Sequence, residues 1–68
     1  MEFRIETEME TDGRWIAGIP ALPGVLTYGE TKSRAVSRAT ALALQVVADR
    51  IEHGEIEIAP DRVIFLAA

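Results

Sequence analysis

The first ten residues alternate between largely apolar and charged side chains. One side of an extended chain would carry Phe3, Ile5, Thr7 and Met9, and the other would carry Glu2, Arg4, Glu6, Glu8 and Glu10. A period of two over this length predicts a strand with one buried and one solvent-facing side. The residues Thr11-Asp12-Gly13 predict a turn, and the apolar run that follows predicts a returning strand. We therefore expect a β-hairpin at the N-terminus.

The length of the hairpin loop decides which side Trp15 faces. A two-residue loop pairs Met9 with Ile16 and turns Trp15 toward the glutamates, whereas a three-residue loop, with Gly13 in the left-handed conformation, pairs Met9 with Trp15. A slip of one residue exchanges the two faces completely. We favour the three-residue loop because it buries three apolar residues of the second strand: Trp15, Ala17 and Ile19.

Residues 19–31, with the sequence IPALPGVLTYGET, combine prolines and glycines with a short apolar run. Pro20 lacks a backbone N–H, so we expect the second strand to end at the residue before it. Pro23 and Gly24 suit the two central positions of a type II turn. The β-branched and aromatic residues of 25–28 then predict a third strand.

The apolar period changes from two to that of an α-helix between Thr31 and His53. Gly29 separates the third strand from this helix, Thr31 is the predicted N-cap, and Gly54 is the predicted residue just past its C-terminus. One broad side of the helix is apolar and contains Ala35, Val36, Ala39, Leu42, Ala43, Leu44, Val46, Val47 and Ile51.

A last apolar run, RVIFLA at residues 62–67, predicts a fourth strand. The order of elements is then βββαβ. The sequence predicts one α+β domain over residues 1–68, in which a single long helix covers a small, mostly antiparallel sheet.

Length and composition narrow the classes of function. The chain has 68 residues, no cysteine, a net charge of −4 and a pI near 4.8, which argues against nucleic acid as the main partner. No apolar run approaches the roughly 20 residues that span a bilayer, and the acidic N-terminus is unlike a signal peptide. We expect a cytoplasmic protein that does not bind membranes. Because a domain this small buries only about 60% of its surface, we also expect a homodimer or a higher homo-oligomer.

The charge is unevenly distributed along the chain. Residues 1–12 carry five acidic side chains against Arg4, a net charge of −4, whereas residues 31–53 carry four basic and two acidic side chains, a net charge of +2. An acidic segment of this kind favours a basic protein surface as partner. The predicted partner-binding residues are Glu6, Glu8 and Glu10, with Trp15 as a further candidate.

Catalytic and metal chemistry find little support in the sequence. Ser37 and His53 lie on one helix, about 24 Å apart at the standard rise, so they cannot form a nucleophile–base pair within one chain. Asp49 and His53 are four residues apart and could share a metal with Glu55 or Glu57, but such scattered ligands are more typical of a solvated helix end. We predict no enzymatic activity, no cofactor and no metal.

Several short motifs occur in the order found in one known family. They are the Asp12-Gly13 turn, the strand Trp15-Ile16-Ala17, Pro20 with Leu22-Pro23-Gly24, and Thr27 with Gly29 and Thr31 before a long helix. In this order and spacing the chain resembles the HicB-like antitoxin domain over nearly its whole length. The resemblance implies a partial ribonuclease-H-like fold without nuclease chemistry. It also implies a prokaryotic toxin–antitoxin system, in which the domain binds and inhibits a small basic RNA-cleaving toxin of the HicA type.

The resemblance leaves two functions to weigh. The first is an antitoxin module that neutralises such a toxin, and the alternative is an orphan oligomeric interaction or accessory module without a toxin partner. Many family members carry a C-terminal DNA-binding domain; because this sequence stops at Ala68, we expect no direct DNA binding. The residues expected to have structural roles are Gly13, Pro20, Pro23, Gly24, Gly29, Thr31 and Gly54.

Overall fold

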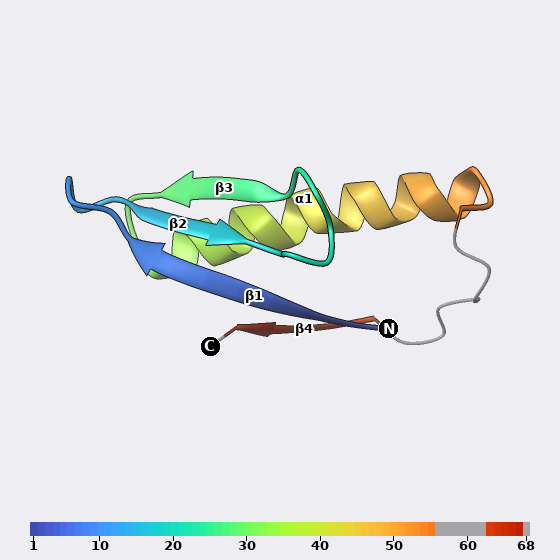
Figure 1. The fold of residues 1–68 in the computed structure, drawn as a ribbon, viewed down its shortest axis with the longest axis horizontal. Coiled ribbons are helices and arrows are strands. Elements are labelled where there is room, and N and C mark those ends of the chain that lie inside the picture. The colour runs from blue at the N-terminus through green and yellow to red at the C-terminus, as the bar shows by residue number, and fades with distance from the viewer. Residues whose placement is uncertain (56–62, 68) are drawn as a thin grey trace.

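The computed structural model describes residues 1–55 and 63–67, and in them one long helix packs on one face of a four-stranded sheet (Figure 1). The elements are β1 (Glu2–Met9), β2 (Trp15–Gly18), β3 (Leu26–Gly29), α1 (Lys32–Glu52) and β4 (Ile64–Ala67). The strand order across the sheet is β3-β2-β1-β4, with β1 and β4 parallel and the other neighbours antiparallel. The predicted α+β class and the order βββαβ are confirmed.

The N-terminal hairpin has the register of the three-residue loop. Met9 lies opposite Trp15, and the N–H of Gly13 donates a hydrogen bond to the carbonyl oxygen of Glu10 at 3.0 Å. Gly13 has a φ of 89°, as the predicted left-handed conformation requires. Trp15 is half-buried and Ala17 is fully buried on the helix side. Met9 shares this side but is 60% exposed, because the helix packs more extensively on β2 and β3 than on β1.

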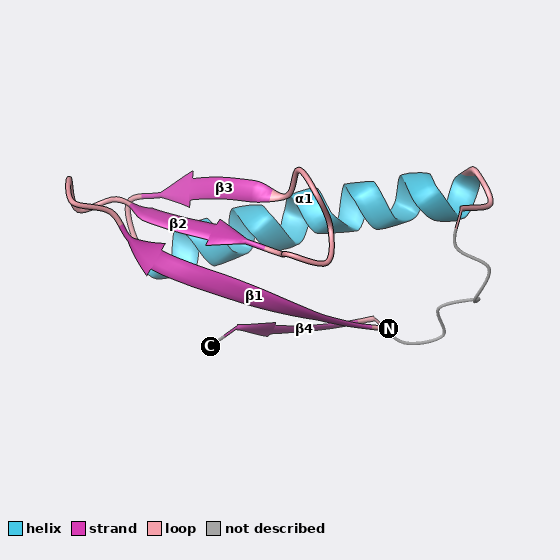
Figure 2. Cartoon of the chain, viewed as in Figure 1, coloured by secondary structure: helices cyan, strands magenta, loops and turns pink. Residues whose placement is uncertain are grey.

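Two successive turns connect β2 to β3 (Figure 2). The N–H of Leu22 donates to the carbonyl oxygen of Ile19 at 2.9 Å, and the N–H of Val25 donates to that of Leu22 at 3.0 Å. The φ of 90° at Gly24 fits the type II turn predicted at Pro23 and Gly24. The side chains of Ile19, Leu22 and Val25 are all buried, so this loop closes one end of the core.

The helix begins and ends at the predicted caps. The hydroxyl oxygen of Thr31 accepts a hydrogen bond from the N–H of Arg34 at 3.1 Å, and Gly54 follows the C-cap residue His53. The fully buried residues form one row with a spacing of four: Ala35, Ala39, Ala43 and Val47.

The predicted apolar side of the helix is broader than the side that the sheet covers. Leu44 is 50% exposed and Ile51 is 40% exposed, so neither belongs to the core. Leu44 lies a quarter-turn away from the alanine row, and the C-terminal part of α1 extends past the strands of the sheet (Figure 1). Leu42 and Val46 pack partly against the core at the margin of the row.

Strand boundaries differ slightly from those expected from sequence. β2 ends at Gly18 rather than at Ile19, and β3 begins at Leu26 rather than at Val25. β4 begins at Ile64, and Arg62, which the predicted fourth strand included, lies outside the described residues. The ring of Phe65 on β4 stacks on the ring of Phe3 with centroids 5.6 Å apart. Within residues 1–55 and 63–67, no helix is both long and apolar enough to cross a membrane.

Candidate functional site

The sheet has one face covered by α1 and one open face, which is turned toward the viewer in Figure 1. Register aligns the open-face residues of β1, β2 and β3 in rows across the strands. One row is Glu6, Gly18 and Leu26, and the next is Glu8, Ile16 and Tyr28. Each row therefore runs from a carboxylate through a small or apolar residue to an exposed apolar or aromatic side chain.

A groove of about 450 Å³ is hollowed into this open face beside the β2–β3 loop. This volume lies within the range of about 300–1,000 Å³ that is typical of ligand-binding clefts. Gly18 contributes no side chain to the floor, and the methyl carbon Cδ1 of Leu26 lies 3.0 Å from the position that a Cβ on Gly18 would take. The groove is lined by Glu6, Thr7, Glu8, Ile16, Gly18, Ile19, Pro20, Leu22, Pro23, Gly24, Val25 and Leu26.

The charged groups of the groove are the carboxylates of Glu6 and Glu8. Both residues are exposed, and within the described residues neither side chain takes part in a hydrogen bond or an ion pair. Alternation along β1 puts them on the same face, about 7 Å apart along the strand. Two carboxylates that form no ion pair with another described residue, beside an apolar floor, give this surface an attraction for cations.

The structure separates the four predicted partner-binding residues into two groups. Glu6 and Glu8 lie together in the groove lining. Glu10 lies past the end of β1, where its N–H donates to the carbonyl oxygen of Arg14 at 2.7 Å, and it does not line the groove. Trp15 packs against the core on the helix-covered face. The open face therefore presents two of the four residues.

Seven groove residues were not predicted as site residues, and three of them, Ile16, Gly18 and Leu26, belong to the rows of the open face. The three-residue hairpin loop already implies that Ile16 and Gly18 face the same side as the glutamates. Alternation alone could thus have found these two residues. Leu26 could not be placed in this way, because its position depends on how the β2–β3 loop turns.

The basic residues near β3 are engaged within the fold. The guanidinium carbon of Arg14 lies 5.1 Å from the ring centroid of Tyr28, and the Nη1 of Arg38 donates to the carbonyl oxygen of Tyr28 at 2.8 Å. Arg14 Nε also donates to Asp12 Oδ2 at 2.9 Å. The hydrogen bond from the N–H of Arg14, together with the Arg14 side chain, holds the pKa of Asp12 below its usual value. These contacts tie the hairpin to β3 and to the helix.

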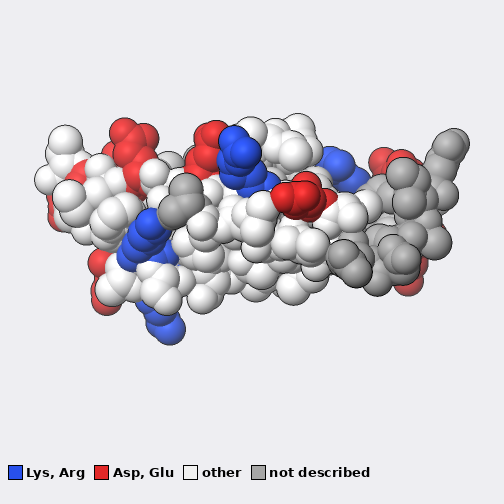
Figure 3. Space-filling view, turned by 90° about the horizontal axis from the view of Figure 1, so that it is seen from below, with Lys and Arg blue, Asp and Glu red and all other residues white. Residues whose placement is uncertain are grey.

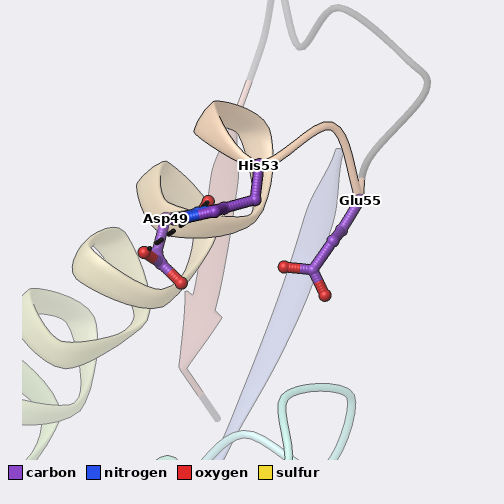
Figure 4. Close-up of side chains that lie close together, drawn as sticks. All are labelled: Asp49, His53 and Glu55. Carbon is purple, nitrogen blue, oxygen red and sulfur yellow. Dashed lines mark hydrogen bonds and ion pairs between the residues drawn. The ribbon is translucent and has the colours of Figure 1, made fainter.

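A second cluster of polar side chains lies at the C-terminal end of α1 (Figure 4). The possible ligand atoms of Asp49, His53 and Glu55 lie within 4.8 Å of one another. All three residues are exposed, and His53 Nδ1 is 2.8 Å from the carbonyl oxygen of Asp49 and 3.3 Å from its Oδ1. These contacts hold the His53 ring against the last turn of α1, and a protonated Nδ1 that donates to this carbonyl leaves Nε2 as the ring nitrogen able to bind a metal. Glu57, the fourth residue considered from sequence, lies outside the described residues.

Among the described residues, the β4 side of the molecule has a broad surface without charged side chains, unlike the groove, where two carboxylates lie together. Figure 3 looks at the molecule from below the view of Figure 1, where β4 lies, and a broad uncharged surface separates the charged side chains.

No protein-family model, curated protein or solved structure matches this chain.

Proposed function

We propose that this chain is an antitoxin-like module that binds a small basic RNA-cleaving protein on the open face of its sheet and neutralises it. The observation that carries the proposal is the acidic groove, in which Glu6 and Glu8 stand beside an apolar floor. The sequence resemblance to the HicB-like domain supports the same kind of partner. This function requires a cytoplasmic protein, because RNA is the target of such a toxin.

The chemistry of the surface explains how binding would inhibit. A protein that cleaves RNA needs clustered Lys and Arg to hold the phosphate backbone. An acidic surface that covers these side chains competes directly with RNA. The groove residues are carboxylates and apolar groups, which suit binding, and we propose no catalytic step for them.

The direct test uses a small basic protein encoded by a gene next to that of this chain. Its RNA cleavage is measured with and without this chain, and association is followed by stopped flow at low salt. The double variant Glu6→Lys and Glu8→Lys should slow association at least about tenfold, because it inverts the charge that steers the encounter.

The matched control is the double variant Glu52→Lys and Glu55→Lys, which changes the net charge equally at the far end of α1. It should leave association within about twofold of the original rate, since screening weakens charges this distant. Equal slowing by both variants would mean that only net charge matters. Unchanged rates for the first variant would remove the groove from the proposal.

The second candidate is an oligomeric interaction module without a toxin. It is favoured by β4, an edge strand with the sequence Ile-Phe-Leu-Ala, in which Ile64 is 36% exposed and Leu66 is 46% exposed. Exposed apolar edge strands pair readily with other chains. Under this candidate, the protein is a homodimer or a higher homo-oligomer held through an apolar contact, so raised salt should not dissociate it.

A further inference from the structure

We propose that the groove over Gly18 is the anchor site for one arginine side chain of the basic partner. The alkyl stem lies on the apolar floor and the guanidinium lies against Glu6 and Glu8. The partner's identity rests on the proposed function, but the chemistry of the groove does not.

The floor of the groove suits an alkyl stem. Gly18 lies between Glu6 of β1 and Leu26 of β3 in the row across the sheet. Because glycine has no side chain, the surface is lowest at Gly18, between a carboxylate and a leucine. Ile16 and the prolines of the β2–β3 loop extend the apolar surface around it. Long basic side chains commonly lay their methylene groups on such surfaces while the charged head stays in water.

The wall of the groove suits a guanidinium. Glu6 and Glu8 are two residues apart on one strand, so their carboxylates project from the same face and can both reach one planar cation. Neither is compensated by a cation within the described residues. Arg4, two residues before Glu6 on β1, lies outside the groove lining and forms no ion pair with either carboxylate.

Arginine fits this site better than lysine or a neutral apolar side chain. A guanidinium is less strongly hydrated than an ammonium group and forms paired hydrogen bonds to carboxylates, so it tolerates a site that is partly apolar. A neutral side chain would leave two carboxylates facing an apolar group without a partner. Arginine is also among the residues that most often anchor protein interfaces.

The test is an NMR titration of this chain with three blocked tripeptides: acetyl-Gly-Arg-Gly-amide, the lysine peptide and the citrulline peptide. Citrulline has nearly the shape of arginine but no charge. At about 10 mM salt, where charges are little screened, the arginine peptide should shift the amide signals of Gly18, Leu26 and Glu6. The lysine peptide should bind about threefold more weakly, and the citrulline peptide should cause no shifts.

Matched variants of this chain assign the binding to the groove. Glu6→Gln should weaken arginine binding about threefold, the size expected for an exposed ion pair. Glu10→Gln makes the same charge change outside the groove and should leave binding unchanged. Gly18→Val fills the floor and should abolish the shifts, and its circular dichroism spectrum reports whether the fold is retained.

Several results would overturn the proposal. They are equal shifts from the citrulline peptide, equal weakening by Glu6→Gln and Glu10→Gln, and shifts spread evenly over all acidic residues. Each of these results is distinct from failure of the proposed function, because the peptide titration needs no toxin. If the Gly18→Val variant neutralises the toxin as well as the original chain does, the proposed function is kept and the arginine anchor is lost. A chain that binds the arginine peptide but neutralises no toxin would keep the anchor and lose the function.

Discussion

The edge strands β3 and β4 belong to the same sheet but are held in place by different contacts. The backbones of β3 and the helix are in close contact at Gly29. A Cβ on this residue would lie 2.5 Å from the backbone nitrogen of Ala35. The hydroxyl of Thr27 donates to the carbonyl oxygen of Ala35 at 2.9 Å. β4 instead pairs with β1 and stacks Phe65 on Phe3, and it exposes apolar side chains on its other face.

This difference shows where the fold is defined most tightly and where it offers a surface. On β3, the Arg38 side chain donates a hydrogen bond to the carbonyl oxygen of Tyr28. This contact helps to protect the edge strand from pairing with another chain. β4 has no charged residue in its sequence to discourage such pairing. We expect substitutions at the β3–helix contact to change stability, and substitutions on β4 to change association.

The largest effect is expected for Gly29→Ala. The added methyl group would contact backbone atoms of Arg34 and Ala35, which cannot rotate away as a side chain can. We expect a loss of about 3 kcal/mol in the free energy of unfolding, measured by urea denaturation followed by circular dichroism. For a chain of this size that is a large share of a total of about 3–10 kcal/mol.

Gly13→Ala is the matched control for this substitution. A Cβ at Gly13 meets nothing within 4 Å, so only its φ of 89° opposes the change. We expect a cost of about 1 kcal/mol. If Gly29→Ala cost no more than Gly13→Ala, the close approach of β3 to the helix would not be the tight contact described above.

A medium effect is expected for Ala39→Leu. Ala39 is fully buried in the row of small residues that lets the helix lie close to the sheet, so the larger side chain must push the two apart. We expect a loss of about 2 kcal/mol by the same measurement. Ala41→Leu makes an identical change on the exposed side of α1 and should alter stability by less than about 0.5 kcal/mol. Equal losses would contradict the importance of the alanine row.

The smallest effect on stability, and the clearest on association, is expected for Leu66→Lys. Leu66 is 46% exposed, so we expect a change below about 0.5 kcal/mol in unfolding. If β4 mediates self-association, sedimentation velocity should show that the original chain is oligomeric and that this variant is monomeric. Leu26→Lys, at a similarly exposed leucine on β3, should keep the oligomer. A monomeric original chain would remove the second candidate function.

Much of the fold could be predicted because its signals are local. Alternation in residues 2–10 identified β1, the cap at Thr31 set the start of α1, and the turn at Pro23 and Gly24 formed as expected. Each of these depends on dihedral preferences and on hydrogen bonds between residues a few positions apart. The hairpin register also followed from the sequence, because only one loop length buries Trp15 together with Ala17.

The candidate site could be predicted only in part. The charge and alternation of Glu6 and Glu8 were visible in the sequence, but the groove beside them was not. It exists because the β2–β3 loop turns back beside the open face and brings Leu26 next to Gly18. Trp15 shows the opposite case: an aromatic residue that suits an interface lies on the helix-covered face, where it is half-buried and packs against the core.

The sequence by itself determined the elements, their order, their caps and the separation of acidic from apolar positions on β1. Only the tertiary structure decided that β4 pairs parallel to β1, that Leu44 and Ile51 stay exposed, and that Gly18 forms the floor of a groove. The physical reason is the range of the interactions. Helix and turn signals act between near neighbours in the chain, whereas strand pairing, burial and a groove depend on segments that meet only after the chain has folded.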